Sequence, residues 1–361
     1  MTTKSAEEEP VSNAGSFLFI GCNPRSQNLC KQEIKQAYPA LSPSFSRPGF
    51  LTYKVNQTFS ERFDLSLTFA RTFGWSLQPT QPQSLSELVS EIISAAEQHK
   101  APHVHVWARD WVDHSLEEKS ESQQAIETLL GELRKQKSKL KINAVTRADE
   151  RVLDVVWGDT DRWWLGWHIA GSIPQRWPGG VPPIQPPESM ISRAYLKTRE
   201  ALLWSGIPVN KGTVCAEIGS APGGSCQRLL ELGAQVIAID PADLAPAISK
   251  HANVTHLKMR GRDVPHRALS EVSLLLADSN VAPTHTLDTV EELVSGKQTH
   301  FRGLILTLKF TDPKMAREID VFIQRIKSWG FRFVKTRQLA YGRQEICVMA
   351  LKQKSARRFS S

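Results

Sequence analysis

The stretch of the sequence best suited to chemistry is a glycine-rich turn, EIGSAPGGSCQRL, at residues 217–229. An apolar run precedes it and an amphipathic run follows it, which predicts a strand, a tight turn and a helix. Such a turn lets a ligand approach the backbone and presents the free N–H groups of a helix N-terminus. The spacing Gly219-x-x-x-Gly223-Gly224 fits neither a dinucleotide fingerprint nor a P-loop, and Pro222 removes one N–H donor. The pattern therefore favours a nucleoside with a zwitterionic amino-acid tail over a phosphate.

An acidic residue follows at the end of the next apolar run. Asp240 closes QVIAID, about twenty residues after the turn, where related sheets use an acid to hold ribose hydroxyls. The alternative is that Asp240 only caps the segment DPADLAP. Its place relative to the turn favours the ribose role.

Four more ionisable side chains stand at the ends of predicted elements. Lys197 lies in SRAYLK, Asp278 closes SLLLAD, Lys309 closes LILTLK, and Glu345 opens EICVMAL. Taken one at a time, lysines in such places are ordinarily solvated. Asp278 is more informative because ligands bind at the carboxyl ends of strands in α/β sheets, and Lys309 because it closes an apolar run.

With the glycine turn, these residues make the back half resemble the FtsJ/RrmJ family of S-adenosylmethionine-dependent RNA ribose 2′-O-methyltransferases. That family has an acidic-Gly-x-x-Pro-Gly-Gly turn and a Lys-Asp-Lys-Glu tetrad, and this sequence matches both in order. The resemblance implies that Lys197, Asp278, Lys309 and Glu345 are catalytic. It implies S-adenosyl-L-methionine as the cofactor, bound by Ser192, Glu217, Gly219, Ala221, Pro222, Gly223, Gly224, Asp240, Asp263 and Asp278.

The tetrad suits methyl transfer to a hydroxyl, which must lose its proton to a general base. A free lysine is too protonated to serve, and a second ammonium nearby lowers its pKa. We expect Lys309 to be the base, Lys197 to keep its pKa low, and Asp278 and Glu345 to orient the two amines.

One position departs from the family pattern. Its members carry an aspartate after the third strand that contacts the adenine end of the cofactor, and Arg260 stands there. Asp263 lies nearby and is the expected substitute.

The front half is similar to that of the family's large-subunit ribosomal RNA methyltransferases, in which a ferredoxin-like unit and a THUMP RNA-binding domain precede the catalytic domain. The stretches LTFARTFGW (67–75) and RWWLGWHIAG (162–171) carry this similarity. It implies a cytidine of 23S ribosomal RNA as the target. Two alternatives stay open: a non-catalytic RNA-binding or ribosome-assembly factor that keeps the fold, and an oxidoreductase, which the glycine spacing disfavours.

The elements that must position these residues alternate along the back half. Apolar runs predict strands at 213–219, 235–240, 254–259, 273–278, 303–310, 331–336 and 345–352, with helices between most of them. The best helix is 312–329. The pattern is typical of a doubly wound α/β sheet, here a Rossmann-like methyltransferase sheet, and the last two strands should form an antiparallel hairpin.

The front half predicts smaller α+β units. A helix at 84–99 begins with Ser84 and Glu87 as a capping box, and strands are expected at 103–109, 151–158 and 162–171. The predicted organisation is a disordered N-terminus (1–15), a ferredoxin-like unit (16–80), a THUMP-like RNA-binding domain (81–172), a proline-rich extended linker (173–189), the methyltransferase domain (190–353) and a basic tail (354–361).

Composition adds the expected partners and location. The formal net charge of +8 favours a polyanion, so RNA is the expected partner. We expect Trp164 to face away from Trp163 and to contact RNA, with phosphates held by Arg147, Arg151 and Arg162. The chain has no apolar run for a membrane and no signal peptide, so a cytoplasmic location is expected. Neither the five scattered cysteines nor His103 and His105 have metal-site spacing, so no metal is expected, and the oligomeric state is left open.

Overall fold

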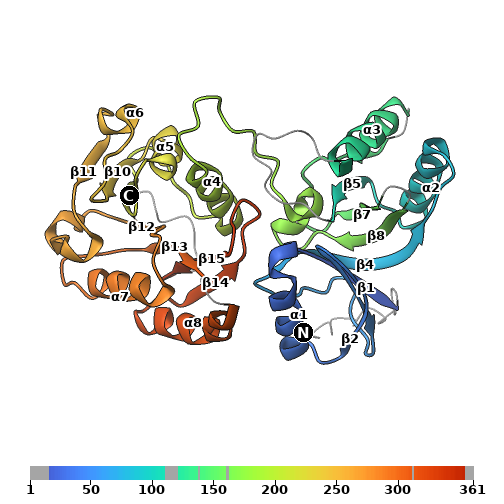
Figure 1. Cartoon of the computed structure of the whole chain (residues 1–361), viewed down its shortest axis with the longest axis horizontal. Helices are drawn as coiled ribbons and strands as arrows, with labels where there is room; N and C mark the ends of the chain where they lie inside the picture. Colours follow the sequence, from blue (N-terminus) through green and yellow to red (C-terminus); the bar gives the residue numbers. More distant parts are fainter. Residues whose placement is uncertain (1–15, 110–120, 137–138, 160–161, 311–312, 354–361) are drawn as a thin grey trace, which may run out of the picture. The chain divides into compact units, whose positions relative to one another are not determined.

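The computed structural model describes residues 16–109, 121–136, 139–159, 162–310 and 313–353. The predicted disordered N-terminus and basic tail lie outside these residues. The chain divides into two compact units, Met1–Val181 and Pro182–Ser361, and Figure 1 shows the elements of each. The division falls inside the proline-rich stretch predicted as a linker.

The second unit contains a seven-stranded sheet in the order β11-β10-β9-β12-β13-β15-β14. Its strands are β9 (Val214–Ile218), β10 (Gln235–Ile239), β11 (Val254–Leu257), β12 (Leu274–Ala277), β13 (Gly303–Lys309), β14 (Phe333–Arg337) and β15 (Glu345–Leu351). The first five in the order are parallel, and β15 is antiparallel to both β13 and β14. This confirms the predicted α/β class and the terminal antiparallel hairpin.

Helices cover both faces of this sheet (Figure 1), with α4 and α5 on one side and α7 and α8 on the other. They are α4 (Ala194–Ser205), α5 (Gly224–Glu231), α6 (Pro246–Ser249), α7 (Pro283–Val294) and α8 (Ile319–Ser328). Short 3₁₀ turns lie at η4 (Gly261–Asp263), η5 (His266–Leu269) and η6 (Pro313–Glu318). The helix predicted at 312–329 thus begins as a 3₁₀ turn in its described part. Because both faces are buried, the strands are nearly continuous apolar runs, and polar side chains concentrate where the strands end.

The first unit contains an eight-stranded sheet in the order β2-β3-β1-β4-β8-β7-β5-β6. Its elements are β1 (Phe17–Cys22), η1 (Pro24–Ser26), α1 (Gln27–Ala37), β2 (Leu41–Arg47), β3 (Phe50–Val55), β4 (Ala70–Thr80), α2 (Leu85–Gln98), β5 (His103–Ala108), α3 (Glu121–Lys135), β6 (Lys141–Ile142), β7 (Arg151–Asp159) and β8 (Arg162–Ile169). Ser84 caps α2 by accepting a hydrogen bond from the Glu87 N–H at 3.2 Å. The Glu87 carboxylate accepts from Gln83 N–H rather than from Ser84.

The sheet continues through residue 80, where the sequence predicts a break between two units. β4 is eleven residues long and pairs with β1 near its start and with β8 near its end, where Thr80 lies opposite Trp163. The segments 16–80 and 81–172 therefore share one sheet. Their assignment to a ferredoxin-like unit and a THUMP-like domain stays a prediction.

The proline-rich segment is ordered rather than simply extended. Its first part forms the 3₁₀ turns η2 (Pro174–Arg176) and η3 (Pro178–Gly180) within the first unit. Arg71 Nε donates to the Gly179 carbonyl at 2.7 Å, and Trp177 is buried. Within the second unit, Ile184 packs against Tyr195 of α4.

The tryptophans of β8 lie on opposite faces of the first sheet, as predicted, but both are buried. Trp163 is 6% exposed in one cluster, and Trp164 is 4% exposed in another. The rings of Phe45 and Phe50 lie 5.3 Å from Trp164, so the expected RNA contact at Trp164 is wrong. The alternation of side chains along β8 was predicted correctly. The face that carries Trp164 is nevertheless buried, because residues of the distant strands β2 and β3 pack over it.

The three arginines proposed for phosphates differ in their surroundings. Arg147 is exposed. Arg151 pairs with Glu61 and lies over the Trp167 ring at 4.8 Å. Arg162 lies over the Trp164 ring at 5.9 Å.

Candidate active site

The four charged side chains singled out in the sequence meet at one edge of the second sheet. Lys197 comes from α4, Asp278 directly follows β12, Lys309 ends β13, and Glu345 begins β15. Because β15 is antiparallel to β13, its first residue lies at the carboxyl end of its neighbour, and Glu345 is the register partner of Lys309. The topology thus brings together residues that lie up to 148 positions apart in the chain.

The contacts between them form a closed ring of alternating charge. Lys197 Nζ donates to Asp278 Oδ2 and lies 3.2 Å from Glu345 Oε1. Lys309 Nζ lies 3.4 Å from Asp278 Oδ1 and 3.6 Å from Glu345 Oε2. The four side chains are between 11% and 23% exposed, so each charge is mostly withdrawn from water yet has two partners of opposite sign.

The protonation of Lys197 follows from this balance. Burial lowers the pKa of Lys197, but the charges and hydrogen bonds of Asp278 and Glu345 outweigh burial, so the pKa lies above its ordinary value. Lys197 therefore remains an ammonium at neutral pH and keeps a positive charge in the ring that contains Lys309.

The glycine turn is packed closely by the protein's own chain. Gly219 has φ of 78°, and a Cβ there would meet the Asp278 carbonyl oxygen at 2.8 Å. A Cβ on Gly224 would collide with Ser192 Oγ and come within 2.9 Å of its carbonyl oxygen. These glycines are needed because the end of β12 and the segment before α4 both press against the turn.

Asp240 holds the turn from the side of β10. Its Oδ2 accepts from the Ala221 N–H at 3.0 Å, and its Oδ1 accepts from the Ala242 N–H at 2.8 Å. The capping contact considered in the sequence is therefore present. Asp240 also lines the large cavity described next, so the same carboxylate is available to a ligand.

A cavity of about 510 Å³ lies along the carboxyl ends of β9, β10 and β12. Of the ten residues predicted to bind the cofactor, four line it: Gly219, Ala221, Asp240 and Asp278. Its opposite wall includes α7, where the Thr286 Oγ1 is buried with no hydrogen-bond partner within the described part of the chain. A glycine turn, a strand-end carboxylate and a free hydroxyl fit a nucleoside with an amino-acid tail.

The end of this cavity beyond β11 is lined by Met259, Arg260, Gly261 and Arg262. Asp263 is not part of the lining, and its side chain is 58% exposed. The position of Asp263 therefore does not support the expectation that it replaces the family's adenine-contacting aspartate.

The α7 wall was missed by the sequence reasoning. His285, Thr286 and Thr289 line the cavity from successive turns of α7. The signal was present in APTHTLDT, where Pro283 begins a helix soon after Asp278, which places that helix against the strand end.

Four predicted cofactor residues in or against the turn do not line the cavity: Ser192, Pro222, Gly223 and Gly224. Ser192 Oγ faces Gly224 and is buried with no partner within the described residues. Gly223 packs against Ile248 of α6. Pro222 carries the carbonyl that accepts from the Ala245 N–H at 2.9 Å.

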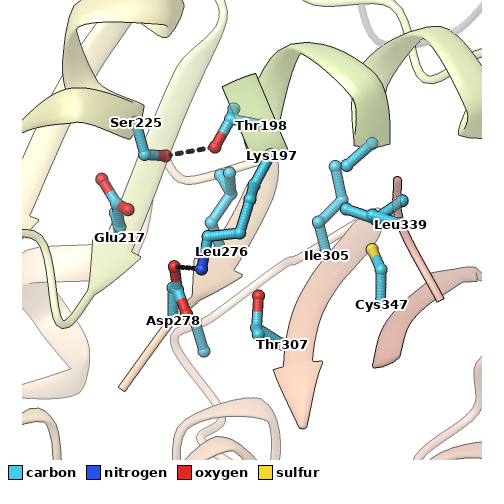
Figure 2. A pocket seen from close by; sticks show the side chains of 12 residues that line it. Lys197, Thr198, Glu217, Ser225, Leu276, Asp278, Ile305, Thr307, Leu339 and Cys347 are labelled. Atoms are coloured by element: carbon cyan, nitrogen blue, oxygen red, sulfur yellow. Dashed lines mark hydrogen bonds and ion pairs between the residues drawn. The ribbon is translucent and has the colours of Figure 1, made fainter. Parts of the chain in front are cut away.

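Glu217 points to a second, smaller cavity of about 20 Å³. It is 1% exposed, and burial raises its pKa to about 8, although hydrogen bonds from Cys226 and Ser225 oppose the rise. Figure 2 shows this cavity with Lys197 and Asp278 in its wall beside Glu217.

The described residues offer neither a metal-binding cluster nor a membrane-spanning helix. Within the described ranges, no group of three or more His, Cys, Asp or Glu side chains is arranged to hold a metal ion. No helix in the same residues is long and apolar enough to cross a bilayer. All five cysteines are buried and free, which confirms the packing role predicted for Cys215, Cys226 and Cys347.

Residues 190–336 match the sequence model of the FtsJ-like methyltransferase family. A ribosomal RNA large subunit methyltransferase M from Halorhodospira halophila is 30% identical over 195 residues, which cover 53% of this chain and 56% of that protein. The protein of the same name from Alkalilimnicola ehrlichii is 32% identical over 162 residues, covering 42% of this chain and 44% of the relative. Another, from Chromohalobacter salexigens, is 28% identical over 242 residues, covering 63% and 66%.

The chain spans about half the length of the first of these curated relatives. The resemblance to the FtsJ/RrmJ family predicted from the glycine turn and the tetrad is confirmed for residues 190–336.

Proposed function

We propose that this protein transfers a methyl group from S-adenosyl-L-methionine to a ribose 2′-hydroxyl of RNA, specifically a cytidine of large-subunit ribosomal RNA. The observation that carries the proposal is that Asp278 belongs to two parts of the site at once. Its carboxylate belongs to the ring of four charges and also lines the large cavity. A carboxylate that contacts the proposed base therefore also lines a nucleoside-sized cavity, within a segment that matches a methyltransferase family.

The cofactor would be held by Gly219, Ala221, Asp240 and Asp278, with Thr286 as an additional hydroxyl. When bound, S-adenosyl-L-methionine supplies an electrophilic methyl group on a positively charged sulfur. The order of strands places Asp240 at the end of β10, between the β11 end of the cavity and the charged ring near β12 and β13. This order suits a ribose at Asp240 and a reacting group near Asp278.

In the proposed mechanism, neutral Lys309 Nζ accepts the proton of the ribose 2′-hydroxyl as the oxygen attacks. Lys197 stays protonated beside the same two carboxylates, so the ring keeps a positive charge next to Lys309. Asp278 and Glu345 each contact both amines, so they fix the Lys309 Nζ position. The proton gained by Lys309 then leaves to solvent, because its side chain is 23% exposed.

The first unit would contribute to binding the RNA. The net charge of +8 supports a polyanionic partner. The relatives' printed names support large-subunit ribosomal RNA as the substrate, and that substrate would place the protein in the cytoplasm. The assignments of residues 16–80 as ferredoxin-like and 81–172 as THUMP-like belong to this proposal.

The test is transfer of labelled methyl from S-adenosyl-L-methionine to unmodified large-subunit ribosomal RNA, followed by digestion to nucleosides. The expected product is 2′-O-methylcytidine, and Lys309→Ala should lose the activity while its cofactor affinity stays near that of the wild type. Label on a base would contradict the proposal, and so would full activity in Lys309→Ala. RNA binding with no transfer would favour the alternative of an assembly factor.

A further inference from the structure

Glu217 is a buried carboxyl group that the mechanism above does not use. It lies on β9, directly before the glycine turn, and is 1% exposed. Although the resemblance assigns Glu217 to cofactor binding, it does not line the large cavity. Its side chain faces the small cavity on the α4 side of the sheet.

That small cavity lies directly against the charged ring. Its polar wall consists of Glu217, Lys197, Thr198, Ser225, Asp278 and Thr307. Its volume of about 20 Å³ is enough for one water molecule, which needs roughly 10–15 Å³ and two to four polar partners. A water there would have a carboxyl group on one side and the Lys197–Asp278 pair on the other.

Hydroxyl groups continue this polar path from α4 to Glu217. Thr198 Oγ1 donates to Ser225 Oγ at 2.9 Å, as drawn in Figure 2. Ser225 in turn hydrogen bonds to the Glu217 carboxyl, and the Cys226 thiol donates to its Oε2 at 3.1 Å. Thr198 is the neighbour of Lys197 on α4. The hydrogen bonds from Thr198 through Ser225 therefore connect the Glu217 carboxyl to the part of α4 that carries Lys197.

We propose that Glu217 is a fifth ionisable member of this site, a positioning residue that acts through Lys197 on the readiness of Lys309 to accept a proton. This inference rests on the proposed function of the ring. While Glu217 is neutral, only the carboxylates of Asp278 and Glu345 offset the charge of Lys197. When Glu217 ionises, a third carboxylate faces Lys197, offsets its charge and makes Lys309 hold its proton more tightly.

Every titratable group around Glu217 enters this balance. Lys197 on α4 favours its ionised form, while Asp278 after β12 opposes it. Cys226 on α5 and Cys215 on β9 itself both have pKa values raised by burial and by Glu217, so they remain neutral thiols. With the pKa of Glu217 raised to about 8 by burial, its change of charge falls in a range where the reaction can be measured.

The experiment measures single-turnover methyl transfer to transcribed, unmodified large-subunit ribosomal RNA across pH. If a base with a high pKa alone controlled the step, the rate would rise about a hundredfold between about pH 7 and about pH 9. Ionisation of Glu217 should bend this rise above about pH 8, so the wild-type rate should increase by clearly less than about a hundredfold. Glu217→Gln, which cannot ionise, should recover the unbent rise of about a hundredfold.

Glu292→Gln on the exposed face of α7 is the matched control and should keep the wild-type bend. Equal pH profiles in wild type and Glu217→Gln would overturn the inference while leaving the proposed function intact. Absence of ribose methylation by the wild type at every pH would instead overturn the proposed function.

A second variant decides the matter if Glu217→Gln does not fold. Ser225→Ala removes a donor that favours the ionised carboxylate, so the bend should move to higher pH. A bend that stays in place in Ser225→Ala would overturn the inference, because a purely structural role of Ser225 would not change the pH at which the rate bends.

Discussion

Replacing Glu217 by glutamine should make the second unit more stable at alkaline pH. Burial raises the pKa of Glu217 from 4.5 to about 8. Between these values the folded protein keeps a proton that the unfolded chain has released, so the wild type loses stability as pH rises. The loss grows by about 1.4 kcal/mol per pH unit and reaches about 5 kcal/mol above about pH 8 as an upper estimate.

The glutamine variant carries no titrating group at this position, so its stability should not show that loss. Any destabilisation that the amide itself causes in the buried pocket is independent of pH. The informative quantity is therefore the slope, against pH, of the difference in unfolding free energy between variant and wild type. The difference in unfolding free energy between variant and wild type should be near its lowest value at about pH 4.5, rise through neutral pH, and level off above about pH 8.

The assay is urea-dependent hydrogen exchange followed by mass spectrometry on peptides from β9 and β12. Those peptides report the second unit alone, whereas tryptophan fluorescence would mostly report the first, which holds eight of the ten tryptophans. Glu292→Gln serves again as the exposed control, and its difference from wild type should not vary in the same way. A difference for Glu217→Gln that is constant with pH would refute the reasoning, since the carboxyl would then have an ordinary pKa.

Three further predictions concern the ring, the cavity and the turn. Glu345→Gln should lower the methyl-transfer rate by about ten- to a hundredfold with cofactor affinity near wild type, because it removes a charge that contacts both amines; an unchanged rate in single-turnover assays would count against its role. Asp240→Asn should weaken cofactor binding by about tenfold in calorimetry, whereas Asp263→Asn should not, since only Asp240 lines the cavity; equal effects would reverse that reading. Gly224→Ala should destabilise the second unit by about 1–3 kcal/mol in hydrogen exchange because its Cβ would collide with Ser192. An equally stable variant would show that the segment before α4 can move aside.

The four residues of the ring were predicted from the resemblance, and the meeting of strand ends at one edge of a parallel sheet explains why two of them lie together. Asp278 follows β12 and Lys309 ends the adjacent parallel strand β13, so their proximity is a consequence of topology. Glu345 joins them only because β15 runs antiparallel, and the short connection between β14 and β15 signalled this. Lys197 was found through the resemblance, since nothing in the pattern of α4 alone says which of its faces meets the strand ends.

What the sequence did not predict depends on packing between distant segments. Trp164 was assigned to the correct face of β8, yet its burial depends on Phe45 and Phe50, over a hundred residues earlier. Glu217 was assigned to the cofactor because of the turn that it precedes. Which face of β9 it occupies is fixed by strand alternation, and whether that face meets solvent, cofactor or α4 is set by tertiary packing.

The most direct test of the central claim is a map of ribose 2′-O-methylation across the ribosomal RNA of cells that lack this protein. One methylated cytidine in large-subunit RNA should disappear from the map. Wild-type protein should restore it, while Lys309→Ala made to the same level should not. An unchanged map, or restoration by Lys309→Ala, would contradict the claim that the ring formed by Lys197, Asp278, Lys309 and Glu345 performs the transfer.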